Sequence, residues 1–142
     1  MVAVASDYFH THFHAGASDQ MEECLDAVPS RVTEDMLMVL SSEFTVEEVK
    51  VALFQMGPTK ALGPDGMNAI FYQKFWHIVG DDVVFTVLDF LNNGNILPEI
   101  NHTNIVLIPK VKDPENMSDF RPISLCNVIY KIISKVLANR LK

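Results

Sequence analysis

Residues 103–142 read TNIVLIPKVKDPENMSDFRPISLCNVIYKIISKVLANRLK. The apolar run at 105–108 is typical of a strand that is covered on both faces. A polar segment with a proline, residues 112–119, predicts a turn, and residues 120–125 predict a returning strand whose proline places part of it at an edge. Apolar residues at helical spacing predict a helix over 127–142. We therefore expect a β-hairpin followed by a long helix.

The rest of the chain reads as mostly helical, so the predicted fold class is α+β. Thr45 and Glu48 form a capping box, and Gly57-Pro58 should end the helix that it begins. Asp65 is the expected N-cap of a helix that buries four apolar residues: Ile70, Phe71, Phe75 and Trp76. Residues 95–102 are expected to be a loop. The helix that Asp65 caps is expected over residues 67–79. The other predicted helices cover residues 4–14, 20–27, 33–40 (with Thr33 as its N-cap) and 82–93, the last beginning at Gly80-Asp81 and ending at Asn93-Gly94.

Charge is unevenly distributed along a chain whose formal net charge is −7. Residues 1–57 carry ten acids and two bases, whereas residues 103–142 carry three acids and seven bases. The total does not suggest a nucleic-acid-binding protein, but a basic C-terminal third on an acidic chain calls for an explanation. Several of these bases lie on the predicted last helix, where they line either a template path or a solvated face.

Cysteine usage and hydropathy indicate the compartment. Cys24 and Cys126 are the only cysteines, and two buried thiols in a reducing compartment are the simplest interpretation. The N-terminal residues have no basic region of a secretory signal, and no apolar stretch approaches the roughly 18 residues that span a bilayer. We expect an intracellular, soluble protein without membrane contact, in either the nucleus or the cytoplasm.

The loop KALGPDG, residues 60–66, is open to two interpretations. Closely spaced glycines let a backbone approach a polyanion, to which Lys60 would add charge. The same letters also describe a tight turn followed by a helix cap. No Gly-Lys-Ser/Thr opens the next helix, so the loop is not a Walker phosphate loop.

Lys110 and Arg121 form the second candidate pair. A hairpin would bring the end of one strand near the start of the next, so both cations could face one site. An Arg guanidinium offers a bidentate fork to phosphate oxygens, and a Lys ammonium acts as a point charge. The alternative is two solvated surface charges beside Asp113, Glu115 and Asp119.

These motifs together resemble the fingers of reverse transcriptases from LINE-type (non-LTR) retrotransposons, with a plant-like pattern. The segment IVLIPK resembles the first fingers motif and DFRPISL the second. The family has a Lys-x-Pro-Gly-Pro-Asp-Gly stretch upstream, matched here by residues 60–66 with Leu62 at the first proline. An aromatic helix like IFYQKFW follows it in plant members. The resemblance implies a right-hand polymerase fold whose fingers are residues 45–142, with residues 1–44 as an upstream linker and with palm and thumb missing.

The resemblance also implies an activity, RNA-directed DNA polymerisation by a retrotransposon enzyme. In that family the residues matching Lys110 and Arg121 bind the incoming nucleotide, and we expect Lys60, Gly63 and Gly66 to contact the template. The implied partners are RNA template, DNA primer, dNTP and the palm and thumb of the same polyprotein, with Mg²⁺ or Mn²⁺ in the complete enzyme. The family's catalytic carboxylates lie in motifs absent from this sequence, so we expect no catalytic residues, no cofactor and no activity of the chain alone. The alternative is a non-catalytic helical interaction module, a remnant of a decayed element.

Two other groups of residues were considered for chemistry. His10, His12 and His14 alternate, but on a helix only the first and third share a face, and no second Cys/His cluster completes a zinc site, so we expect no metal site. Asp81-Asp82 follows no aromatic strand and is expected to cap a helix rather than to bind metal.

Overall fold

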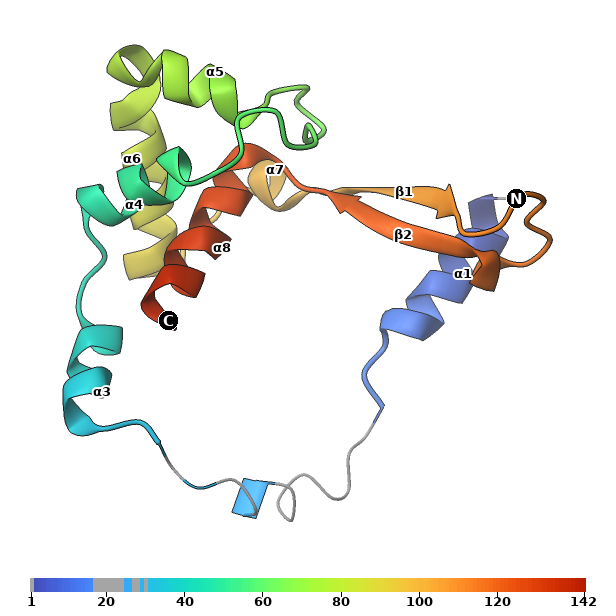
Figure 1. The fold of residues 1–142 in the computed structure, drawn as a ribbon, viewed down its shortest axis with the longest axis horizontal. Helices are drawn as coiled ribbons and strands as arrows, with labels where there is room; N and C mark the ends of the chain where they lie inside the picture. The colour runs from blue at the N-terminus through green and yellow to red at the C-terminus, as the bar shows by residue number, and fades with distance from the viewer. Residues whose placement is uncertain (1, 17–24, 27–28, 30) are drawn as a thin grey trace.

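The computed structural model describes residues 2–16, 25–26, 29 and 31–142. It is a mixed α+β structure, as predicted: most of the described helices gather at one side, a two-stranded antiparallel hairpin reaches away from them, and the N-terminal helix lies beside the far end of that hairpin (Figure 1). The strands are β1 (Asn104–Pro109) and β2 (Phe120–Leu125), joined by a turn that contains the 3₁₀ helix η1 (Met117–Asp119). The helices are α1 (Val2–Phe13), α3 (Glu34–Ser41), α4 (Val46–Phe54), α5 (Ala69–Lys74), α6 (Trp76–Asn93), α7 (Pro98–Asn101) and α8 (Val128–Arg140).

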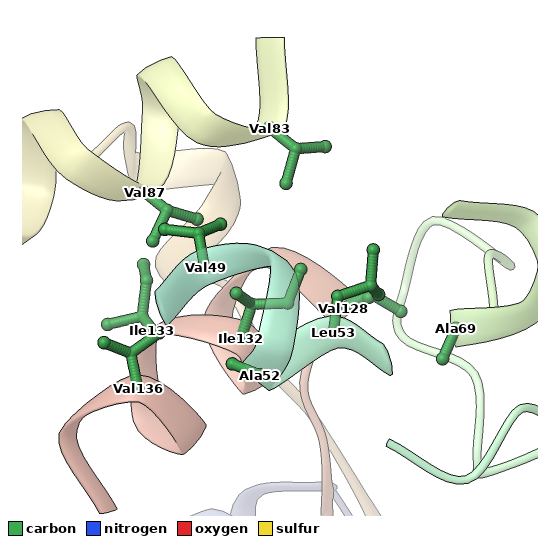
Figure 2. Close-up of a cluster of buried hydrophobic side chains, with 10 residues drawn as sticks. All are labelled: Val49, Ala52, Leu53, Ala69, Val83, Val87, Val128, Ile132, Ile133 and Val136. Carbon is green, nitrogen blue, oxygen red and sulfur yellow. The ribbon is translucent and has the colours of Figure 1, made fainter. Parts of the chain in front are cut away.

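The hydrophobic core lies where α4, α6 and α8 meet, and Figure 2 shows their buried side chains pointing toward one another. Apolar residues recur along each helix at intervals of three or four, which places them on one face. Because each such stripe needs a partner, the three helices bury one another rather than the hairpin. The core cluster comprises Val49, Ala52, Leu53, Ala69, Val83, Val87, Val128, Ile132, Ile133 and Val136.

The predicted start of α4 is confirmed in detail. The Thr45 hydroxyl accepts a hydrogen bond from the Glu48 backbone N–H, and the Glu48 carboxylate accepts one from the Thr45 N–H at 2.8 Å. Phe44 packs against the core cluster that contains Val49. The cap therefore fixes both the beginning of α4 and the direction from which the chain enters it.

The boundary between the next two helices differs from the prediction. The chain breaks at Phe75, which is exposed rather than buried, and α6 then runs without interruption through Gly80 and Asp81. Gly80 is buried because the indole ring of Trp76 lies against it, and a Cβ at that position would be 2.9 Å from the ring. The glycine therefore provides room for an aromatic ring one turn earlier and does not end a helix.

Two further local predictions are corrected. The N-cap of α5 is Asn68, whose side chain accepts from the Phe71 N–H, while the Asp65 carboxylate accepts from the Met67 N–H two residues ahead, within the loop. Residues 95–102 are not all loop, because Pro98 opens the one-turn helix α7. Gly94 does end α6 as predicted, with a left-handed φ of 78°.

The hairpin forms as predicted, but the expectation that its first strand is covered on both faces is wrong. Ile105, Val106 and Ile108 are all exposed, because the second strand covers only an edge of β1 and the helical core lies elsewhere. Strand pairing runs from Asn104 opposite Leu125 to Pro109 opposite Phe120.

The N-terminal helices stand apart from the core. The helix predicted over 4–14 is confirmed as α1, and the Thr33 hydroxyl caps α3 by accepting from the Met36 N–H. The helix predicted at 20–27 falls largely outside the described residues. Within the described part of the chain, no helix is both long enough and apolar enough to cross a membrane.

Candidate nucleotide and nucleic-acid interface

The register of the hairpin determines where Lys110 and Arg121 lie. The Lys110 backbone N–H donates to the Asp119 carbonyl at 2.7 Å, and Arg121 is paired with Ile108 two residues along each strand. Lys110 directly follows β1, and Arg121 is the second residue of β2, so both cations lie at the same end of the hairpin. The structure thus places the two predicted residues near the turn.

The two prolines of the hairpin fit this register. Hydrogen-bonded pairs alternate along an antiparallel ladder, so Lys110–Asp119 and Ile108–Arg121 belong to the bonded set. Pro109 and Pro122 then fall in the pairs whose N–H groups would point outward. The loss of both donors therefore leaves the ladder intact.

The turn beyond the strands is held by Asp119. Its carboxylate accepts from the Glu115 N–H at 3.2 Å and from the Asn116 N–H at 2.9 Å, while the Lys110 ammonium donates to the Ser118 carbonyl at 2.7 Å. These bonds fix the end of the hairpin, where both cations lie. The sequence contains the capping-box pattern of Asn116 and Asp119, within the region predicted only as a polar turn.

The charged side chains at this end of the hairpin differ in how many hydrogen bonds they form. Among the described residues the Arg121 guanidinium is exposed and takes part in no hydrogen bond or ion pair, and the Lys110 ammonium keeps two donors beyond its bond to Ser118. The Asp119 carboxylate is directed into the turn. The arrangement therefore leaves one unengaged cation, Arg121, and one partly engaged cation, Lys110, at the same end of the hairpin.

The glycine-rich loop at 57–66 packs on the start of α8. A Cβ at Gly63 would overlap the Cα of Asn127 and would lie 2.8 Å from its backbone N. The Lys131 ammonium donates to the Ala61 carbonyl at 2.7 Å, which holds the loop to the first turn of the same helix. Gly66 has a left-handed φ of 70° in open space. Lys60 is exposed.

Asn127 connects this loop to the rest of the fold. It is buried, its side-chain oxygen caps α8 by accepting from the Tyr130 N–H, and its side-chain N–H donates to the Ile100 carbonyl at 2.7 Å. The loop and the two cations lie at opposite ends of the hairpin, because β2 enters α8 at Asn127 while the turn lies at the far end of the strands (Figure 1). They are therefore two separate surfaces.

Arg140 at the end of α8 is the polar centre that sequence reasoning missed. All five of its N–H donors are used: two on the Glu48 carboxylate, two on the Leu40 and Ser42 carbonyls, and one on the Glu43 carbonyl. Its side chain is only 8% exposed. We expected α8 to carry its bases on a solvated face or a template path, and neither describes Arg140.

Electrostatics around Arg140 are strong. Its Nε lies 2.6 Å from a Glu48 oxygen, and its guanidinium carbon lies 3.6 Å above the Phe44 ring. The hydrogen bonds from Arg140, together with those from Thr45, lower the pKa of Glu48 from 4.5 to about 2. No local sequence signal joins these residues, which are 92 positions apart.

The remaining candidates, the three histidines and the Asp81-Asp82 pair, do not form a site. His10 stacks on His14, and His12 stacks on Tyr8 instead, so the three histidines do not converge. The described residues contain no group of three or more His, Cys, Asp or Glu side chains placed to hold a metal ion. Asp81 and Asp82 lie inside α6, on its exposed surface, so the prediction that they cap a helix is wrong.

Comparison with protein-family models finds no match. Sequence comparison finds relatives. The chain is 32% identical over 124 residues, 87% of its length, to the transposon TX1 uncharacterized 149 kDa protein of Xenopus laevis. It is 26% identical over 135 residues, 94% of its length, to the retrovirus-related Pol polyprotein from type-1 retrotransposable element R2 of Bradysia coprophila. The chain is a homologue of non-LTR retrotransposon proteins.

These retrotransposon proteins are much longer than the chain. It spans 9% of the TX1 protein and 14% of the R2 polyprotein. Because most of the chain is matched in each case, the similarity extends beyond the hairpin into the helical core. The similarity therefore concerns one segment of each of these longer proteins.

Proposed function

We propose that this chain is the fingers part of a non-LTR retrotransposon reverse transcriptase, with the β1–β2 hairpin binding the triphosphate of an incoming nucleotide. The observation that supports the proposal is the register that places Lys110 and Arg121 at the same end of the hairpin. Homology to a protein named as a Pol polyprotein supports the class of element. The fingers would comprise residues 45–142, with residues 1–44 as the upstream linker.

The chemistry of the two side chains suits a polyphosphate. An arginine fork can donate two parallel hydrogen bonds to one phosphate group, while a lysine ammonium neutralises a neighbouring one without a fixed orientation. Since Asp119 and Ser118 fix the turn, the strand ends that carry both cations are held before a ligand arrives.

The loop at 57–66 is the proposed template contact, and its residues have different roles. Gly63 sets the loop directly on Asn127, so its contribution is to position the loop. Lys60 and Gly66 are exposed and would meet the backbone of an RNA template. The primer would be held by the palm and thumb of the larger polyprotein, which the similarity to much longer proteins accommodates.

We further propose that these 142 residues do not catalyse nucleotide addition by themselves. Nucleotidyl transfer uses two metal ions held by carboxylates, which activate the attacking hydroxyl and stabilise the leaving oxygens. In the family that the sequence resembles, those carboxylates belong to motifs outside the fingers. The chain would therefore contribute nucleotide binding, and the metal-dependent step would need the palm.

Direct binding of a dNTP tests the nucleotide site. We expect calorimetric titration to give weak affinity that falls with added salt, and Arg121→Ala to lower it about tenfold, as expected for a charge-assisted hydrogen bond of roughly 1.5 kcal/mol. Lys110→Ala should have a smaller effect. The matched control is Lys112→Ala, which removes the same charge from the same turn but leaves the paired strands unchanged.

Circular dichroism of each variant should match that of the wild type, so that any loss of affinity reports the site. Unchanged dNTP affinity in the Lys110→Ala, Arg121→Ala double variant would contradict the proposal and favour a non-catalytic interaction module.

In a primer-extension assay we expect no product from the chain alone. Metal-dependent synthesis that survives Arg121→Ala would refute both the inertness and the role of Arg121.

A further inference from the structure

Helix α6 presents an aromatic side chain between two acids on its outer surface. Its buried valines, Val83 and Val87, point into the core (Figure 2). Phe85 lies two positions from each of them, on the opposite face of the helix, and is 73% exposed. Asp81 and Asp89 lie one turn before and one turn after it, so the three side chains form a single row along the surface.

This row borders a groove between α6 and α4. The groove has a volume of about 590 Å³, and α4 contributes Val46, Glu47 and Lys50 to its lining. On α6 the lining residues from Asp81 to Asn93 recur along about 18 Å of helix, which is the length of three helical turns. A long groove between two packed helices is a shape that a third helix can fill.

The fold fixes both walls of this groove. Val49 of α4 and the two buried valines of α6 belong to one core cluster. Near the end of α6, the Asn92 side-chain oxygen accepts from the Phe44 N–H at 2.9 Å, and its side-chain N–H donates to the Phe44 carbonyl at 3.4 Å. A partner would therefore meet walls that binding does not have to order first.

Negative charge dominates the lining of the groove. The lining holds three acids, Glu47, Asp81 and Asp89, and one base, Lys50. Among the described residues the carboxylates of Glu47 and Asp81 take part in no hydrogen bond or ion pair, whereas Asp89 accepts from two asparagine side chains. Helix α6 also carries Asp82 and contains no lysine or arginine. Two carboxylates at the groove are thus available to cations.

We propose that this groove binds a basic amphipathic helix that belongs to another polypeptide. The apolar face of that helix would cover Phe85 and the neighbouring Val84 and Leu88, and its lysines or arginines would meet Glu47 and Asp81 at the rim. Large aromatic residues are frequent anchors of protein interfaces. Because α6 and the end of the hairpin lie at opposite sides of the molecule, this partner would not compete with a ligand of the hairpin (Figure 1).

Three other occupants suit the groove less well. Nucleic acids and the anionic surfaces of membranes are negatively charged like the groove itself, which would repel them. A second copy of the chain offers no suitable helix among its described elements, because α8, which carries the most bases, buries its apolar stripe in its own core. The complementary helix therefore belongs to a different polypeptide.

Titration with a synthetic peptide tests the proposal. The probe is a helical peptide of about 14 residues, or roughly four turns, with leucines on one face and lysines and arginines on the other. Trp76 is the only tryptophan of the chain and lines the groove, so its fluorescence reports binding of a peptide that lacks tryptophan. We expect saturable binding that weakens with added salt.

Two further peptides, each lacking one property of the probe, serve as controls. The first has glutamate in place of every base and keeps the leucine face. The second is a scrambled peptide that keeps the composition but has no apolar face. We expect each to bind roughly tenfold more weakly than the probe, because the groove needs both an apolar face and positive charge.

A variant of the aromatic residue tests the apolar part of the contact. Phe85→Ala should weaken binding of the basic peptide roughly tenfold, as expected for the anchor of an interface. The matched control is Ile78→Ala, which truncates a residue that is 66% exposed on the same helix but does not line the groove. Circular dichroism should show unchanged helix content in both variants.

Charge reversal tests the rim. Asp81→Lys should weaken binding of the basic peptide several-fold, whereas Asp82→Lys, at the next position along the helix but outside the lining, should weaken it much less. The double variant Glu47→Lys, Asp81→Lys should bind the glutamate peptide more tightly than the wild type does. Such an exchange of preference requires that the peptide charges meet these residues.

Three results would overturn the proposal: a Trp76 signal that the basic peptide does not change, equal affinities for the basic and glutamate peptides, or equal losses of affinity in Phe85→Ala and Ile78→Ala. A Trp76 signal that changes with the concentration of the chain alone, and that Phe85→Ala abolishes, would assign the groove to a second copy instead. None of these outcomes depends on dNTP binding, so the proposed nucleotide site keeps its own test.

Discussion

At the scale of single residues, Gly63 and Gly66 occupy the same loop for different reasons. Gly63 lies against the backbone of Asn127, where any side chain would collide with the start of α8. Gly66 has open space around it, but its φ of 70° disfavours residues with a Cβ. The spacing of the glycines in the sequence does not show which one is needed because a side chain would collide and which one is needed for its left-handed backbone.

The two glycines should therefore respond differently to alanine. We expect Gly63→Ala to lower the free energy of unfolding by about 3 kcal/mol, because the loop or α8 must move. Gly66→Ala should lower it by only about 1 kcal/mol, the strain of a left-handed residue. Urea denaturation measures both. Equal losses would mean that the loop does not press on α8 as the structure has it.

At the scale of elements, α8 depends on a single side chain to hold the segment before α4. The five donors of Arg140 reach three carbonyls between residues 40 and 43 and the carboxylate that also caps α4. A flat guanidinium can serve acceptors in several directions within its plane while stacking on Phe44. A lysine ammonium can neither donate to several acceptors in one plane nor stack flat on an aromatic ring.

Replacing Arg140 should show this difference. We expect Arg140→Lys to lower the free energy of unfolding by about 2 kcal/mol although the charge is kept, because most of the fork's hydrogen bonds are lost. Lys135→Ala on the same helix serves as the control and should change stability by less than about 0.5 kcal/mol. If Arg140→Lys were as stable as the wild type, charge alone would account for the contact.

Local signals in the sequence predicted several elements, and long-range contacts explain the failures. The capping box of Thr45, the terminator at Gly94 and the hairpin around Pro122 each depend on a few neighbouring residues, which the sequence displays directly. The pairing of Arg140 with Glu48 and the contact of Gly63 with Asn127 depend on the assembled fold.

The same distinction applies to errors of interpretation. Gly80 reads as a helix breaker because its partner, the Trp76 ring, becomes evident only once the helix is formed. An apolar run at 105–108 reads as a buried strand because periodicity describes the strand and not what covers it. For the candidate site, the hairpin could be predicted, but the register that aligns Lys110 with Arg121 required the structure.

At the scale of the whole molecule, the stability of the helical part should depend on pH through Glu48. Its pKa is about 2 in the fold and 4.5 as an ordinary carboxyl. Between these values the unfolded chain binds the proton more readily than the folded one. The stabilisation from Glu48 is therefore complete above about pH 4.5 and is lost as the pH falls toward 2.

Comparing the wild type with Glu48→Gln isolates this contribution from that of other carboxylates. We expect the wild type to be more stable than the variant at pH 6, and the gap to narrow markedly at pH 3. Urea denaturation at both pH values measures the difference. A gap of the same size at both values would show that the charge of Glu48 does not stabilise the fold.

The Arg140–Glu48 contact also bears on how the protein is made. Ninety-two positions separate its two partners. At typical rates of synthesis the second is added roughly 5 to 18 s after the first. During that interval the apolar face of α4 has no α8 to pack against, and such surfaces attract other nascent chains. We therefore infer that the core around α4 closes only once α8 has left the ribosome, and that chaperones have an opportunity to act before then.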